Sequence, residues 1–244
     1  MATRPFWREA GLYAALCGYT VVLLVTDARL TTVWPQFALA ATAFALLFWL
    51  SRELGPDGRR ELWCTIVVSL ALELWGTQVW GLYGYRFLNV PPYVPPGHGL
   101  IFLACTRASR AGWVVRHERA FTRSVLGLAT AWGLWGLVVA PALGGVRDWH
   151  GALYWPFFAT LMTFSKRAGA HAWTFLVASA LELFGTWLGT WHWAPVMPGL
   201  GLGAADPPSC VAGGYCFFAA AGVSWAEAWQ RRRERRPVTA QPAS

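Results

Sequence analysis

Long apolar stretches, separated by short polar segments, run along almost the whole chain. We predict that eight of them are helices, with ends near 10–27, 36–52, 62–81, 98–113, 124–143, 151–166, 172–190 and 209–230. Apolar runs of about 17–25 residues are typical of helices that cross a bilayer. The pattern therefore predicts an all-α, polytopic membrane protein with about eight transmembrane helices. The first run has no small-residue cleavage site, so we interpret it as a span rather than a signal peptide.

Two of these stretches carry nearly the same sequence around an acidic residue. The first signature, residues 71–77, reads ALELWGT, and the second, residues 180–186, reads ALELFGT. Each is followed by a glycine and alternating aromatic residues, at 81–85 and 189–193. The copies lie about 109 residues and an even number of spans apart, so they run in the same direction. This predicts two parallel four-helix repeats, 1–113 and 114–230, related by an axis along the membrane normal, with a basic tail at 231–244.

Composition and charge agree with a membrane location and indicate an orientation. The chain is 56% apolar and only 13% charged, which is unlike an ordinary soluble domain. If the N-terminus is cytoplasmic, seventeen of the twenty Lys and Arg residues are cytoplasmic, and only Arg29, Arg86 and Arg147 lie outside. We therefore expect a bacterial plasma-membrane protein with both termini in the cytoplasm. Its basic loops would meet anionic membrane lipids, and nothing indicates a nucleic-acid partner. The charge does not indicate an oligomeric state.

The acidic residues of the two signatures, Glu73 and Glu182, are the first candidates for chemistry. A carboxyl group inside a span is costly, and it indicates a functional site by default. No basic residue in the spans is an evident partner, so we expect both groups to stay protonated and poised to donate a proton. A purely structural role, with each carboxyl hydrogen-bonded to a neighbouring helix, is the alternative.

Aromatic residues are the second candidates, because the chain has seventeen Trp residues and about half of them fall outside the interfacial positions where Trp anchors spans. Aromatic faces attract cations, so a neutral acid among them suits protonation of an alkene. We predict a pocket between the halves, near the outer leaflet, where Gly76 and Gly185 leave room for a chain-like ligand. The predicted substrate-binding residues are Gly76, Trp80, Tyr83, Tyr85, Gly185, Trp187, Trp191 and Trp193.

Among the histidines, His98 is the third candidate for catalysis, because it opens the span that follows the first signature. His150 and His192 also lie on the outward side, and with the two glutamates they could form a metal site. No metal-binding histidine spacing occurs, however, and we predict no metal and no cofactor. Asp27 and Asp206 are expected to be solvated loop residues.

The first signature resembles integral-membrane carotenoid-biosynthesis proteins of the bisanhydrobacterioruberin hydratase type. The likeness rests on Glu73-x-x-Gly76-Thr77, on residues 81–87, GLYGYRF, and on Val90-Pro91. It covers about 20 residues directly and 20 more through the repeat. Small membrane-integral terpene cyclases are a more distant analogy. This chain has Tyr83 alone where a Pro-Phe pair is expected before the second glycine. The resemblance implies a role for Glu73 only.

Three functions fit these patterns. The first is an intramembrane enzyme, a cyclase or hydratase, that protonates a C=C bond of an isoprenoid or related lipid. The second is a small transporter or lipid-binding protein that uses Glu73 and Glu182 as a pseudo-symmetric proton or substrate site. The third is a structural subunit. The cytoplasmic halves of the spans are closed and apolar, which favours the enzyme over a transporter.

Overall fold

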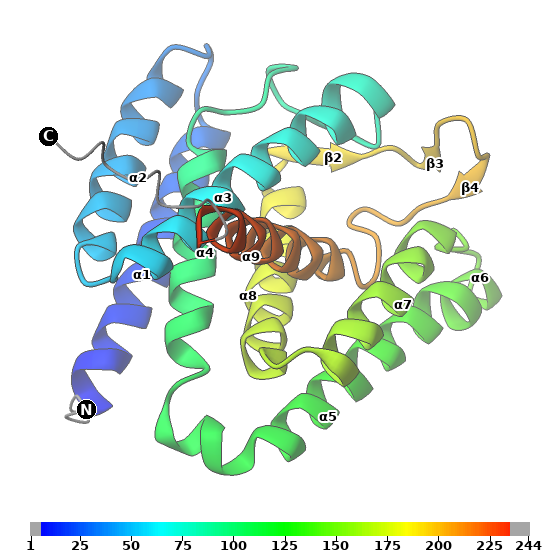
Figure 1. The fold of residues 1–244 in the computed structure, drawn as a ribbon. Coiled ribbons are helices and arrows are strands. Elements are labelled where there is room, and N and C mark those ends of the chain that lie inside the picture. Colours follow the sequence, from blue (N-terminus) through cyan, green and yellow to red (C-terminus); the bar gives the residue numbers. More distant parts are fainter. Residues whose placement is uncertain (1–5, 235–244) are drawn as a thin grey trace, which may run out of the picture.

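The computed structural model describes residues 6–234, and in this part the chain is mostly helical (Figure 1). The first four helical segments are α1 (Phe6–Ala28), α2 (Pro35–Ser51), α3 (Pro56–Leu74) continued by the π-helical turn η1 (Trp75–Trp80), and α4 (Val94–Ala108). The next four are α5 (Gly112–Leu134) with η2 (Trp135–Val139) and α6 (Ala140–Ala142), then α7 (Trp149–Phe164), α8 (Ala168–Leu188) and α9 (Ala212–Glu234). The eight predicted stretches fall on these eight helical segments.

Three helical segments are long and apolar enough to cross a membrane, namely Ala10–Ala28, Pro56–Trp80 and Gly112–Ala142. Pro35–Ser51 is a shorter apolar helix.

Large apolar side chains are exposed along several segments, including Val22, Trp49, Val138 and Trp187. Polar side chains such as Asp27, Glu73 and Glu182 are buried. An apolar surface around a polar interior is the arrangement expected of a protein surrounded by lipid.

The four central helices come from both predicted repeats. α3 packs most extensively on α9, and α4 packs on α8, so each central helix of one half lies against a helix of the other. The α3–α9 contact is very close, because a Cβ atom at Gly222 would lie 2.4 Å from the Cα atom of Thr65. Figure 1 shows α9 near the centre, with α1 and α2 on one side and α5 to α7 on the other. The two halves therefore do not fold as separate domains.

Four short strands lie at one end of this helical core. β1 (Tyr83–Tyr85) follows η1, and β2 (Trp191–Trp193) follows α8. β3 (Val196–Met197) and β4 (Leu202–Gly203) form a separate antiparallel hairpin in the loop before α9. β1 and β2 hold the aromatic residues that follow the two signatures.

Candidate functional site

A two-stranded antiparallel ladder brings the two signatures together. β1 pairs with β2 in the register Tyr83 to Trp193, Gly84 to His192 and Tyr85 to Trp191. Each strand begins soon after a glycine with left-handed backbone angles, Gly81 with φ 73° and Gly189 with φ 71°. Glycine adopts this conformation without the steric cost of a Cβ atom, and it commonly ends helices. The glycines turn each chain back, so that its aromatic residues face the carboxyl group that lies about two helical turns before the glycine.

In the first centre, Glu73 is buried and has three side-chain partners. The Tyr83 hydroxyl donates to Oε2 over 2.5 Å, and the Tyr85 hydroxyl donates to the same oxygen over 3.1 Å. Nε2 of His98 lies 2.9 Å from Oε1. Burial, followed by the nearby Glu73 carboxylate, raises the pKa of both tyrosines well above its ordinary value, so they remain donors. The expectation that no basic residue pairs with Glu73 is therefore wrong.

In the second centre, Glu182 is equally buried but accepts from a different set of groups. The indole N–H groups of Trp191 and Trp193 donate to Oε2 over 2.9 and 3.0 Å. The Tyr215 hydroxyl, from α9, donates to Oε1 over 2.6 Å. Tyr215 was not predicted as a site residue. The only signal for it in the sequence is a hydroxyl-bearing aromatic residue inside the last apolar stretch.

Two ring contacts join the centres into one buried group. The Tyr83 and Trp193 rings lie with their centroids 4.4 Å apart, and the His98 and Tyr215 rings are 5.1 Å apart. Each contact pairs a partner of Glu73 with a partner of Glu182. Packed aromatic rings therefore link the surroundings of the two carboxyl groups.

The two signature glycines make room for these rings. A Cβ atom at Gly185 would lie 1.9 Å from the Trp191 ring, which no real structure tolerates. A Cβ atom at Gly76 would lie 3.0 Å from the Tyr83 ring, which is tight. In both halves the space beside the glycine is thus filled by an aromatic side chain of the same half rather than left open.

Two of the predicted substrate-binding residues lie apart from the carboxyl groups. The indole of Trp80 is partly exposed and donates to the carbonyl of Pro198 over 2.9 Å. Trp187 is 77% exposed and stacks on Phe184. The two carboxyl centres and the paired strands contain the other predicted residues, Glu73, Gly76, Tyr83, Tyr85, His98, Glu182, Gly185, Trp191 and Trp193.

Two buried aspartates, Asp27 near the end of α1 and Asp148 just before α7, hold segments that flank the paired strands. The expectation that Asp27 is solvated is wrong, because it is fully buried. Its burial is compensated by Gln36 at the start of α2, which donates to it over 2.7 Å and accepts from Asn89. Asp148, also fully buried, accepts from the backbone N–H groups of Gly151, Ala205 and Ser209. Asp206 has a partly exposed side chain that accepts from the backbone N–H of Trp193 and contacts His192.

The predicted histidines do not converge. His150 is buried and packs on the rings of Tyr154 and Trp193, whereas His192 is exposed beside Asp206. Within residues 6–234, no three His, Cys, Asp or Glu side chains lie close enough together to hold a metal ion.

Comparisons with protein-family models, with curated proteins and with solved structures found no match for this chain.

Proposed function

We propose that all eight helical segments cross a bacterial plasma membrane, in two parallel four-helix repeats with both termini in the cytoplasm. The arginine asymmetry supports the orientation. The reciprocal packing of α3 on α9 and of α4 on α8 supports the repeat, because a two-fold axis exchanges these two contacts. Reporter fusions after Arg123 and after Arg236 test the topology. Both should report the cytoplasm, and an external signal at either position would contradict the proposal.

We further propose that the chain is an intramembrane enzyme that protonates a C=C bond of an isoprenoid or related lipid. The observation that carries this proposal is the buried pair of Glu73 and His98, 2.9 Å apart and surrounded by aromatic rings. A proton held between a carboxyl and an imidazole is exchangeable, since either group can carry it. A buried site also strengthens electrostatic stabilisation of a cation.

In the proposed step, the proton of the Glu73–His98 pair forms a C–H bond with the π electrons of the alkene, and the adjacent carbon becomes cationic. In a hydratase, a water oxygen then bonds to that carbon, and the proton lost from water returns to the pair. In a cyclase, a second C=C bond attacks the cation to form a C–C bond. A neighbouring C–H then gives its proton back to the pair and restores a C=C bond. The resemblance to carotenoid hydratases favours the first outcome.

Glu182 has a different role in this proposal. Two of its three donors are indole N–H groups, which donate but do not accept. Their hydrogen bonds hold Oε2 in place and offer it no partner that could take up a proton, so in this proposal Glu182 orients the aromatic residues of the site. Glu73 is thus the proton donor and Glu182 the group that orients the aromatic rings, whereas the sequence alone suggested two equivalent acids.

The test begins with mass spectrometry of lipids extracted from the purified protein. A polyene or prenyl lipid supports the enzyme, whereas a co-purified polar solute favours the transporter. The identified lipid is then incubated with the protein in D₂O. The product should gain one carbon-bound deuterium, and Glu73→Gln should remove this label while Glu53→Gln, on the opposite side of the molecule, keeps it. A labelled product from Glu73→Gln would contradict the assignment of the donor.

A further inference from the structure

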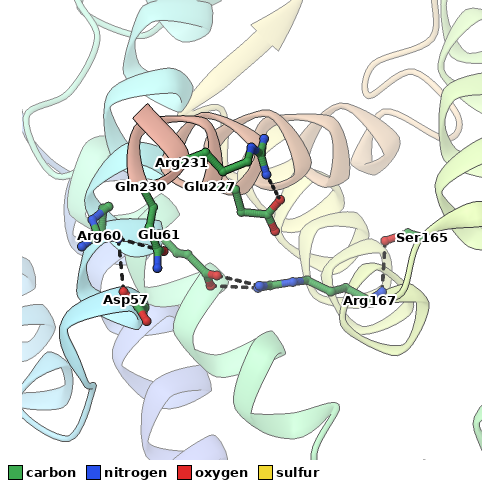
Figure 2. A network of polar contacts seen from close by, with 8 residues as sticks. All are labelled: Asp57, Arg60, Glu61, Ser165, Arg167, Glu227, Gln230 and Arg231. Atoms are coloured by element: carbon green, nitrogen blue, oxygen red, sulfur yellow. Dashed lines mark hydrogen bonds and ion pairs between the residues drawn. The ribbon is translucent and has the colours of Figure 1, made fainter. Parts of the chain in front are cut away.

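The end of the molecule opposite the paired strands carries a charged network (Figure 2). Arg167, which precedes α8, makes two hydrogen bonds to Glu61 of α3, over 2.8 and 2.6 Å. Arg60 contacts Asp57 and also Gln230 of α9, each over 3.1 Å. Since Glu61 is twelve residues before Glu73, the network lies about 18 Å from the first centre along α3. Ionic side chains gathered at one level mark the depth of lipid headgroups or water.

A groove lies on α9 at this same level, on a face that the network does not use. Its lining is Trp225, Ala228, Trp229 and Arg232, and its volume is about 440 Å³. This face is distinct from the one that α9 packs on its neighbours, which includes Val223 and Ala226. Trp225 and Trp229 are 44% and 49% exposed. The i, i+3, i+4 and i+7 spacing places the four residues in one stripe along the helix.

Arg232 differs from the arginines of the network. Arg60, Arg167 and Arg231 each contact a carboxylate. Arg232 is exposed, and it makes no hydrogen bond or ion pair with any residue in the range 6–234. Arg231 and Arg233 flank it in the last turn of α9. The groove thus ends in a cation that has no partner among residues 6–234, and two half-exposed indoles lie one and two helical turns before it.

We propose that this groove binds one anionic phospholipid of the cytoplasmic leaflet, with its phosphate on Arg232 and its upper acyl chain along Trp225 and Trp229. Arg guanidinium groups suit phosphate oxygens geometrically, and Trp rings favour the boundary between headgroups and acyl chains. The negative charge of the headgroup complements the Arg-rich end of α9. The proposal requires insertion in a membrane, but it does not require the enzymatic activity proposed above.

Native mass spectrometry of the full chain in detergent, titrated with phosphatidylglycerol or with phosphatidylcholine of the same acyl chains, tests this site. Phosphatidylglycerol should be retained more strongly. Arg232→Gln should lower its retention about fivefold, which corresponds to about 1 kcal/mol per basic residue near a lipid surface. Arg233→Gln is the matched control, with the same loss of charge on another face of α9, and it should change retention much less.

Exchange of both indoles, Trp225→Leu with Trp229→Leu, should weaken both lipids, because the acyl contact is common to them. Equal losses in Arg232→Gln and Arg233→Gln would overturn the proposal, since they would indicate only a diffuse charge effect. Displacement of the lipid by millimolar glycerol phosphate would also overturn it, by indicating a site for a soluble phosphate. A dimer that the double Leu variant abolishes would instead assign the groove to a second copy of the chain.

Discussion

The Glu73 and Glu182 centres have the same layout but different chemistry. In each, a carboxyl group on the third helix of a half accepts from two aromatic residues of a following strand and contacts one residue of the fourth helix. Around Glu73 these partners are two tyrosine hydroxyls, which donate, and a histidine, whose ring nitrogen can give or take a proton. Around Glu182 two of the three are indoles, which cannot accept one. Under the proposed function, this difference makes Glu73 the proton-exchanging group and Glu182 the group that orients the aromatic rings.

The buried aspartates near the two centres, Asp27 and Asp148, also differ in the groups that donate hydrogen bonds to them. Asp27 and Asp148 each precede a Trp-Pro pair by seven residues, at Trp34-Pro35 and Trp155-Pro156. Asp27 is held by a side chain, Gln36, whereas Asp148 is held by three backbone N–H groups. The loop between β2 and α9 is longer than the loop between β1 and α4, and it contains β3 and β4. Asp148 anchors the backbone of this longer loop directly. A buried backbone N–H that loses its acceptor is costly.

The largest difference between the centres should appear in turnover. Glu73→Gln should fold and insert but lose about 10²–10⁴-fold in rate, the usual contribution of general acid–base catalysis. His98→Gln should also lose rate, because it removes the second group that can carry the proton. Glu182→Gln should lose less. Equal losses for Glu73→Gln and Glu182→Gln would remove the distinction between the proton donor and the group that orients the aromatic rings.

The next difference concerns the glycines. Gly185→Ala forces its new methyl group into the Trp191 ring, whereas Gly76→Ala needs only a shift of a few tenths of an ångström at Tyr83. We expect Gly185→Ala to destabilise the protein by about 3 kcal/mol and Gly76→Ala by about 1 kcal/mol, because overpacking typically costs about 1–3 kcal/mol. Unfolding in mixed detergent micelles measures both. Similar midpoints for the two variants would mean that the second centre repacks as easily as the first.

How far the sequence predicts these features depends on whether a contact is local. The apolar runs predict the helices, and the duplicated motif predicts that Glu73 and Glu182 belong to one site. Tyr215 could not be predicted in this way, because it reaches Glu182 only through the packing of α9 on α8. The burial of Asp27 was also missed, because an aspartate beside a loop is usually solvated, and its partner Gln36 lies in the next apolar stretch.

The aspartates should differ in their contribution to stability. Asp148→Asn replaces one acceptor oxygen by an amide NH₂ group facing backbone N–H groups, and we expect a loss of about 3 kcal/mol, in the range for hydrogen bonds to charged groups. Asp27→Asn should cost about 1 kcal/mol, because the Gln36 side-chain amide can rotate to offer its oxygen. Thermal unfolding in detergent compares the two variants. A larger loss for Asp27→Asn would show that the first half depends more on its buried carboxylate.

The smallest expected effects concern the tryptophans. They distinguish the ring of Trp193 from its N–H hydrogen bond, and both from a tryptophan on the exposed surface. Trp193→Leu removes both the ring that packs on Tyr83 and the N–H that binds Glu182. It should lower turnover about 2- to 30-fold, since a cation–π contact contributes about 0.5–2 kcal/mol. Trp193→Phe keeps a π face and removes only the N–H. The loss of turnover should be smaller in this variant, and it measures the contribution of that hydrogen bond.

Trp187→Leu is the control, because this indole is 77% exposed and away from both carboxyl groups. Turnover of this variant should be unchanged. If Trp187→Leu were as harmful as Trp193→Leu, the tryptophans would act by anchoring the protein in lipid, and the aromatic faces would have no part in stabilising a cation.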